Sequence, residues 1–246
     1  MLARQPMVDL LVLAMVAANA LVGPAMLSVD AQGWWAATAG LFGTSAVVWI
    51  ALALAARRLW LELQPVPAKE PGVEPLGRLR PVCVFLVAVG CLLPSAQVAW
   101  GMGALYFLAR LVARRGAGVR LSTGCLIAFA VCVRVPVTWV LTTVFAEDLL
   151  QVDAVLSGLL ASLVAPIQSI DGNIVVNASG HRLFVMTGCS SLNNLSLAIL
   201  FWFAVTRGLL PSGSRPPVGH LLLLARLVVP LTGTRPRPLA PSPPTS

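Results

Sequence analysis

The chain has 246 residues, of which 58% are hydrophobic and only 11% are charged, against about 25% charged residues in an ordinary soluble domain. This composition excludes a soluble globular protein, a disordered chain and a disulfide-rich secreted module, because so much apolar surface cannot be hidden in one core. The formal net charge is +8, but the basic residues are scattered between apolar runs, which is typical of membrane loops and predicts no nucleic-acid partner.

The sequence predicts an all-α polytopic membrane protein, with residues 1–233 as a single integral membrane domain of about seven transmembrane helices and one short extracytoplasmic β-hairpin. The stretch from Pro81 to Val112 is too long for one span, and Pro94-Ser95-Ala96-Gln97 indicates a tight turn in its middle. Spans are therefore expected at residues 7–27, 34–56, 81–95, 97–112, 122–145, 188–206 and 217–233, and a proline-rich disordered tail is expected at 234–246.

Residues 147–166 follow a different pattern from the spans. The segment carries acidic residues near its start, and its apolar residues recur at helical spacing on one face: Val152, Val155, Leu156, Leu159, Leu160 and Leu163. Its uncharged part is too short to cross a bilayer easily. The pattern favours an interfacial helix, with a true membrane span as the alternative.

Residues 172–187 are the only strand-like part of the chain. Ile174, Val175 and Val176 precede a turn that contains Gly180, and a second β-prone run follows it. Two such runs around a glycine-containing turn predict a β-hairpin.

The distribution of basic residues predicts the orientation of the chain. With the N-terminus in the cytoplasm, 12 of the 17 basic residues fall on the inner side: Arg4, Arg57, Arg58, Lys69, Arg78, Arg80, Arg110, Arg114, Arg115, Arg120, Arg207 and Arg215. The outer connections between spans hold only Arg182. This asymmetry supports seven spans, with the hairpin and the tail outside.

The residues after the hairpin are the best candidates for chemistry. By this topology Cys189 lies at the outer N-terminal end of a membrane helix, where free N–H groups and the helix dipole favour a thiolate. Asn193 and Ser196 follow it on the same helical face, and Ser190 and Asn194 widen that polar face. Polar groups are costly in a bilayer without partners, so this face is expected to meet other helices or a wet cavity.

A packing role is the alternative for Cys189, because a lone membrane cysteine is usually a small packing residue, and that interpretation fits the other four cysteines. A nucleophile needs a partner base or cation. Candidates for this cation at a suitable depth are Arg235, Arg237 and Arg182. Two further arginines, Arg134 and Arg226, are intramembrane cations. Each either has a functional role or is structural, with its charge reaching the membrane surface or pairing with a backbone carbonyl. No metal-ligand cluster and no cofactor motif is evident.

The segment 172–202, GNIVVNASGHRLFVMTGCSSLNNLSLAILFW, resembles the exosortase/archaeosortase family of polytopic membrane transpeptidases. The likeness lies in the Gly-x-Ile strand, the turn glycine, the β-run ending in a small residue, and the Cys-Ser-Ser from which a helix starts. Arg134, two residues ahead of Pro136, fits the family layout more loosely.

This resemblance implies a cysteine peptidase or transpeptidase, a hydrolase of the bacterial inner membrane, with Cys189 as the nucleophile and Arg235 as the positional match to a family arginine. Its partners would be exported proteins that carry a C-terminal motif, a membrane helix and a basic tail, together with membrane lipids. The protein would cleave such sorting signals without a cofactor and transfer the proteins to an envelope or extracellular acceptor. The alternatives are a catalytically inactive relative and a non-enzymatic polytopic scaffold or transporter.

Overall fold

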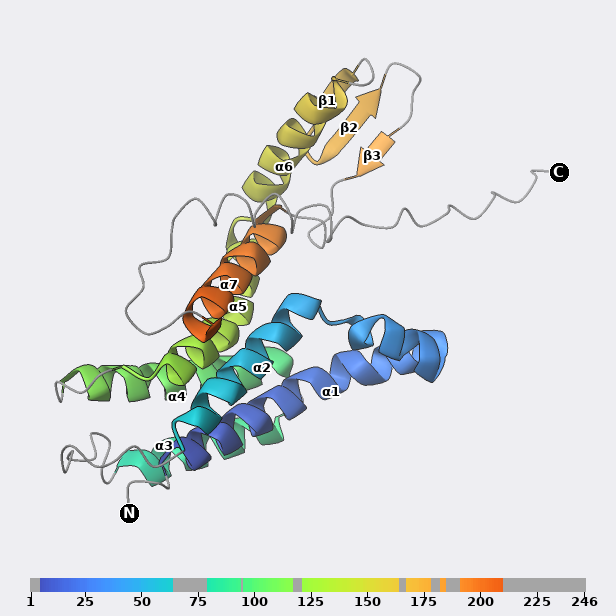
Figure 1. The fold of residues 1–246 in the computed structure, drawn as a ribbon. Coiled ribbons are helices and arrows are strands. Elements are labelled where there is room, and N and C mark those ends of the chain that lie inside the picture. The colour runs from blue at the N-terminus through green and yellow to red at the C-terminus, as the bar shows by residue number, and fades with distance from the viewer. Residues whose placement is uncertain are drawn as a thin grey trace.

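The fold is known from a computed structural model that describes residues 5–63, 79–93, 95–116, 121–163, 167–177, 182–184 and 191–209. This part of the chain is mostly helical (Figure 1). Four helices in it are long and apolar enough to cross a membrane: α1 (Gln5–Ala39), α4 (Ala96–Gly116), α5 (Thr123–Val144) and α7 (Ser191–Leu209). The protein is therefore a polytopic helical membrane protein. The expected span at 217–233 and the expected tail at 234–246 lie outside the described residues.

Two shorter apolar helices complete the bundle, α2 (Ala46–Leu61) and α3 (Leu79–Leu92). The expected break between residues 81 and 112 separates α3 from α4, and Ser95 at this break accepts a hydrogen bond from the N–H of Val98. A methyl group on Gly90 of α3 would lie 2.6 Å from the Met102 side chain of α4. The two helices therefore pack closely against each other, and Asn19 of α1 holds α3 by donating a hydrogen bond to the Cys91 carbonyl.

The connection after the first helix differs from the expected one. The sequence places a link at 28–33 and a second span from Trp34, whereas α1 runs on to Ala39 with a kink at Gly33, where φ is 78°. The chain then reverses through the 3-10 turn η2 (Leu41–Gly43) before α2 begins. The helix is interrupted at Gly33, where the backbone is non-helical, and the chain reversal follows through residues with positive φ at Leu41, Phe42 and Gly43.

Small residues allow the helices of the core to approach one another. The buried core is shared by α1, α2, α3, α4, α5 and α7, and its fully or almost fully buried members include Val12, Val16, Ala51, Ala55, Leu59, Ala99, Phe107, Ile127, Ala128, Val131 and Ala204. Cys125 and Cys132 of α5 are also 0% exposed. They fill the role of small packing residues that the sequence suggests for them.

We expect the packing of α2 on α5 to depend on Gly124. A Cβ there would lie 2.6 Å from Leu59 Cγ and 2.8 Å from the Leu59 backbone nitrogen, so Gly124→Ala forces backbone movement and destabilises the fold by about 1–3 kcal/mol. Gly101→Ala is the matched control, because nothing lies within 4 Å of its added methyl group. Detergent-based unfolding of the full chain measures both variants, and equal stabilities would contradict the close approach.

Beyond the end of α5, the chain forms a helix with a small sheet beside it (Figure 1). Helix α6 (Ala146–Ala161) is followed by β1 (Ile167–Asp171), β2 (Ile174–Asn177) and β3 (Arg182–Phe184), in the order β1-β2-β3 with antiparallel pairing. The paired strands β2 and β3 lie within the expected hairpin, 172–187, with Val175 opposite Leu183.

Two features of this region differ from the expectation. The expected helix at 147–166 ends earlier, at Ala161, and β1 is a third strand that the pattern of apolar residues does not indicate, because Ile167-Gln-Ser-Ile-Asp is mostly polar. The turn that joins β1 to β2 uses Gly172 with φ of +56°, a conformation that glycine adopts without strain.

Candidate functional site

The predicted site residues are divided between the described and undescribed parts of the chain. Cys189, Ser190 and Arg235 lie outside the described residues. Asn193 and Asn194 lie in the first turn of α7, which begins at Ser191, and both side chains are partly buried.

An arginine from α5 binds the polar face of α7. Arg134 Nη2 donates to Asn193 Oδ1 at 2.5 Å, and Arg134 Nε donates to Ser196 Oγ at 3.0 Å. The Ser196 hydroxyl in turn donates to the carbonyl oxygen of Asn193 at 2.7 Å. We call these three residues the Arg134 cluster. The sequence indicates an intramembrane cation at Arg134 and a polar face on α7, but no local pattern predicts that the two are in contact.

The neighbours of Arg134 on α5 modify the helix at this level. Pro136 has no N–H to donate to the carbonyl of Cys132, so one helical hydrogen bond is missing just beside the arginine. Thr138 Oγ1 donates to the Arg134 carbonyl at 2.9 Å. A proline and a threonine that bonds back to the chain are common where a membrane helix bends.

The Arg134 guanidinium donates hydrogen bonds to neutral groups of α7. Within the part of the chain that the structure describes, its hydrogen-bond partners are an amide oxygen and a hydroxyl, and no carboxylate pairs with it. An intramembrane cation without a counter-ion is costly, which makes such a residue a candidate for binding an anion or stabilising developing negative charge.

The Arg134 cluster also fixes the depth at which α7 begins. Arg134 is ten residues before the end of α5 at Val144, which corresponds to about 15 Å along the helix axis. Because Asn193 contacts it, the first turn of α7 lies beside the middle of α5. The start of α7 is thus recessed relative to the end of α5.

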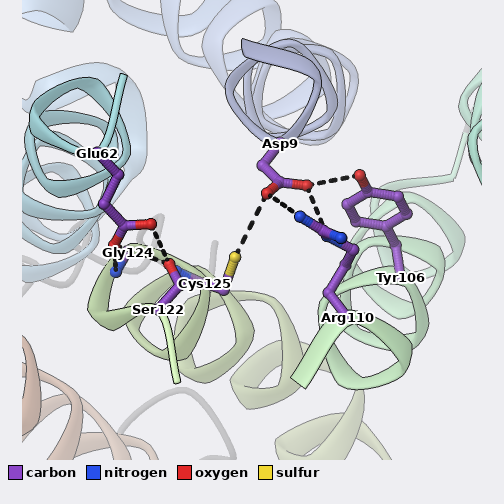
Figure 2. Close-up of polar contacts among 7 residues, drawn as sticks. All are labelled: Asp9, Glu62, Tyr106, Arg110, Ser122, Gly124 and Cys125. Atoms are coloured by element: carbon purple, nitrogen blue, oxygen red, sulfur yellow. Dashed lines mark hydrogen bonds and ion pairs between the residues drawn. The ribbon is translucent and has the colours of Figure 1, made fainter. Parts of the chain in front are cut away.

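A second polar cluster joins three helices at the other end of the bundle (Figure 2). Arg110 of α4 forms a buried ion pair with Asp9 of α1, with Nη2 at 3.0 Å from Oδ2 and Nε at 3.1 Å from Oδ1. Tyr106 donates its hydroxyl to Asp9 Oδ1 at 2.7 Å, and Cys125 Sγ lies 3.6 Å from Asp9 Oδ2.

Arg110, which its sequence context groups with the basic residues of the inner side, lies instead inside the helical bundle. The side chain is 0% exposed inside α4, which continues to Gly116. A buried arginine is stable here because the Asp9 carboxylate neutralises it and accepts a bidentate pair of hydrogen bonds. The two charges neutralise each other and the ion pair joins α1 to α4, so we assign this cluster a structural role.

Two further contacts hold the helix ends at the same side. Glu62, which follows α2, accepts hydrogen bonds from Ser122 Oγ at 2.6 Å and from the Gly124 N–H at 3.3 Å (Figure 2). A carboxylate at a helix N-terminus satisfies free N–H groups and the dipole. Arg58 Nε donates to the Gly208 carbonyl at 2.7 Å, which joins the ends of α2 and α7.

No group of three His, Cys, Asp or Glu residues within the described ranges is placed to hold a metal ion. No protein-family model, curated protein or solved structure matches this chain.

Proposed function

We propose that the protein is an exosortase-like membrane cysteine protease and transpeptidase that cleaves the C-terminal sorting signals of exported proteins and transfers them to an envelope or extracellular acceptor. The Arg134 cluster is the observation that carries the proposal. It brings Arg134, for which the described part of the chain shows no carboxylate partner, against the polar face of α7, and in the sequence Cys189 stands four residues before Asn193 and seven before Ser196.

The chemistry needs a thiolate and a group that stabilises negative charge. The Cys189 sulfur attacks the carbonyl carbon of the scissile peptide bond, and the oxyanion that forms collapses as the C–N bond breaks. The departing amine takes up a proton from water, and a thioester remains on the cysteine. An acceptor nucleophile then attacks that thioester, forms the new bond and releases the thiolate. A fixed cation that contacts the polar face of α7 favours the thiolate and the oxyanion of this proposed reaction.

The orientation proposed for this function has the N-terminus in the cytoplasm of a bacterial inner membrane and the active site toward the outer face, with about seven spans. Helix directions support it, because the start of α1, the ends of α2, α4 and α7 and the start of α5 meet at one side of the bundle. The basic residues near that side include Arg57, Arg58, Arg114, Arg115 and Arg207. Excess positive charge marks the cytoplasmic side.

The second candidate function is a scaffold, or an inactive relative, in which the Arg134 cluster only packs α5 against α7. The hydrogen bonds of Arg134 to Asn193 and Ser196 favour this alternative because they join α5 to α7. The two functions differ in the reactivity of Cys189, which a packing role leaves as an ordinary thiol.

Labelling of intact cells with a membrane-impermeant sulfonated maleimide tests the proposal. We expect rapid labelling that requires Cys189, with the half-maximal rate at a pH below about 8.5, the ordinary value for a free thiol. Cys189→Ser is expected to remove the signal, and Cys132→Ser is the matched control because Cys132 is 0% exposed.

Two results would count against the proposal. Labelling of Cys189 only after the inner face is opened would reverse the orientation. Labelling from the outside with the pH dependence of an ordinary thiol would favour the scaffold.

A further inference from the structure

An apolar groove lies between α4 and α5 on the surface of the helical bundle. Its volume is about 590 Å³, and its lining is almost entirely apolar. Leu105 of α4, which is 62% exposed, and Val137 of α5, which is 46% exposed, both line it. The groove therefore has room for the apolar side chains of a further element. Other side chains that line it include Ala104, Leu108, Val133 and Val140.

The groove occupies the side of α5 that its neighbours in the described part of the chain leave open. Helix α2 contacts α5 at Gly124, α4 contacts it at Cys132, and α7 contacts it at Arg134. Around an ideal helix, with about 100° per residue, Cys132 lies about 80° and Arg134 about 280° from Gly124. The groove residues Val133 and Val137 lie between these two contacts, at about 180° and 220°. A helix placed in the groove therefore packs on α5 between α4 and α7.

The sequence after α7 carries an apolar stripe that suits this groove. Residues 217–233 are expected to span the membrane, and in a helix one face of them would carry Pro217, Leu221, Leu224, Val228 and Leu231, at steps of four and three. Arg226 falls on the opposite face, about 180° from Pro217. Only the apolar face suits the groove, because a cation inside it would lose its hydration without gaining a partner. On the far face, a long basic side chain can extend toward the headgroups.

We infer that the apolar stripe of residues 217–231 packs into the groove between α4 and α5. The lengths agree, because at about 1.5 Å per residue a helical stripe from 217 to 231 covers about 21 Å, and the α5 lining from Phe129 to Leu141 covers about 18 Å. Membrane helices associate through close van der Waals packing, which the groove offers along most of this length. Helix α5 is then enclosed by helices on all four sides.

The connection from α7 favours this segment over a second copy of the chain. Arg58 near the end of α2 binds the Gly208 carbonyl near the end of α7, so the two helices end at the same side of the bundle. Helix α5 begins at that side. Residues 210–216 separate α7 from Pro217, and seven residues span up to about 23 Å, against about 8–10 Å between the axes of packed helices. The tether gives the segment a high effective concentration at the groove, which a second copy lacks.

Photo-crosslinking in the full chain tests this docking. Leu105 or Val137 is replaced by p-benzoylphenylalanine, and the protein is reconstituted in phosphatidylcholine vesicles and irradiated. Phe85, 65% exposed on α3 and outside the groove lining, is the matched control. All three side chains are exposed, so the substitution displaces no core side chain. Proteolysis and mass spectrometry identify the adducts.

We expect most adducts at Leu105 and Val137 to join residues 217–233 of the same chain, and adducts at Phe85 to join lipid. Mainly lipid adducts at the two groove positions would overturn the inference, and so would the absence of any adduct to residues 217–233. A crosslinked dimer would overturn it in favour of a second copy.

A pair of charge substitutions tests which face of the segment enters the groove. Leu224→Arg places a cation on the apolar stripe, whereas Leu223→Arg places it on the side nearer Arg226. We expect Leu224→Arg to reduce the adducts between Leu105 and residues 217–233 by at least about tenfold, because the groove offers a cation no partner. Leu223→Arg is expected to leave them close to the original level, and equal effects would contradict the assignment. This docking goes beyond the proposed function and does not depend on Cys189, whose labelling is measured separately.

Discussion

Arg134→Gln is expected to slow processing of exported precursors by about 100- to 1000-fold, because the loss of one preorganised donor to a developing oxyanion has this effect in other acyl-transfer enzymes. Glutamine keeps hydrogen-bonding capacity toward Asn193 and Ser196 but removes the charge. Accumulation of uncleaved precursors, quantified by mass spectrometry of their C-terminal peptides in the membrane fraction, measures the effect. Cys189→Ala sets the reference for complete loss.

A purely structural role for Arg134 is separated from an electrostatic one by the labelling of Cys189. If the charge favours the thiolate, Arg134→Gln moves the half-maximal maleimide labelling to higher pH, and Arg134→Lys restores part of the shift. Arg207→Gln is a control on α7, because Arg207 is exposed at the far end of that helix. Unchanged labelling together with unchanged processing in Arg134→Gln would remove Arg134 from the mechanism.

Asp9→Ala is expected to destabilise the protein by about 3–5 kcal/mol, because it leaves Arg110 as a buried charge without its partner. Arg110→Met is expected to destabilise the protein by a similar amount, because it leaves the Asp9 carboxylate buried without its partner. The double variant Asp9→Ala/Arg110→Met removes both charges. We expect its loss of stability to be smaller than the sum of the losses in the two single variants. Unfolding of the full chain in mixed micelles with increasing denaturing detergent measures all three.

The control for this series is Arg115→Met, which removes an exposed charge from the same helix. Its effect is expected to stay within about 0.5 kcal/mol. If Asp9→Ala behaved like this control, the buried ion pair would contribute nothing to stability. If the three variants were strictly additive, the two side chains would not interact.

Hydropathy predicts the helical membrane class and the region of α5, because a continuous apolar run with clear ends leaves one interpretation. The structure has α5 at Thr123–Val144 against an expected span at 122–145. The first connection is misplaced because polarity and chain reversal occur at different residues there. Asp30 lies within α1, whereas the reversal follows at Leu41–Gly43.

Side-chain partners are harder to predict than helices, because the partners come from distant parts of the sequence. Arg110 is separated from Asp9 by 101 positions, and its neighbours Arg114 and Arg115 give its segment the composition of a basic loop. The polar face of α7 is visible in the sequence at Asn193 and Ser196. Its pairing with Arg134 requires the antiparallel packing of α5 and α7, which no local pattern specifies.

The buried ion pair has a consequence for the order of assembly. Asp9 is synthesised 101 residues before Arg110, which corresponds to roughly 5–20 s at a translation rate of about 5–20 residues per second. During that interval Asp9, in the second turn of α1, lacks the Arg110 guanidinium, and an unpaired acidic side chain is costly inside a membrane. We therefore expect the first turns of α1 to insert fully only after α4 has been synthesised and its Arg110 pairs with Asp9.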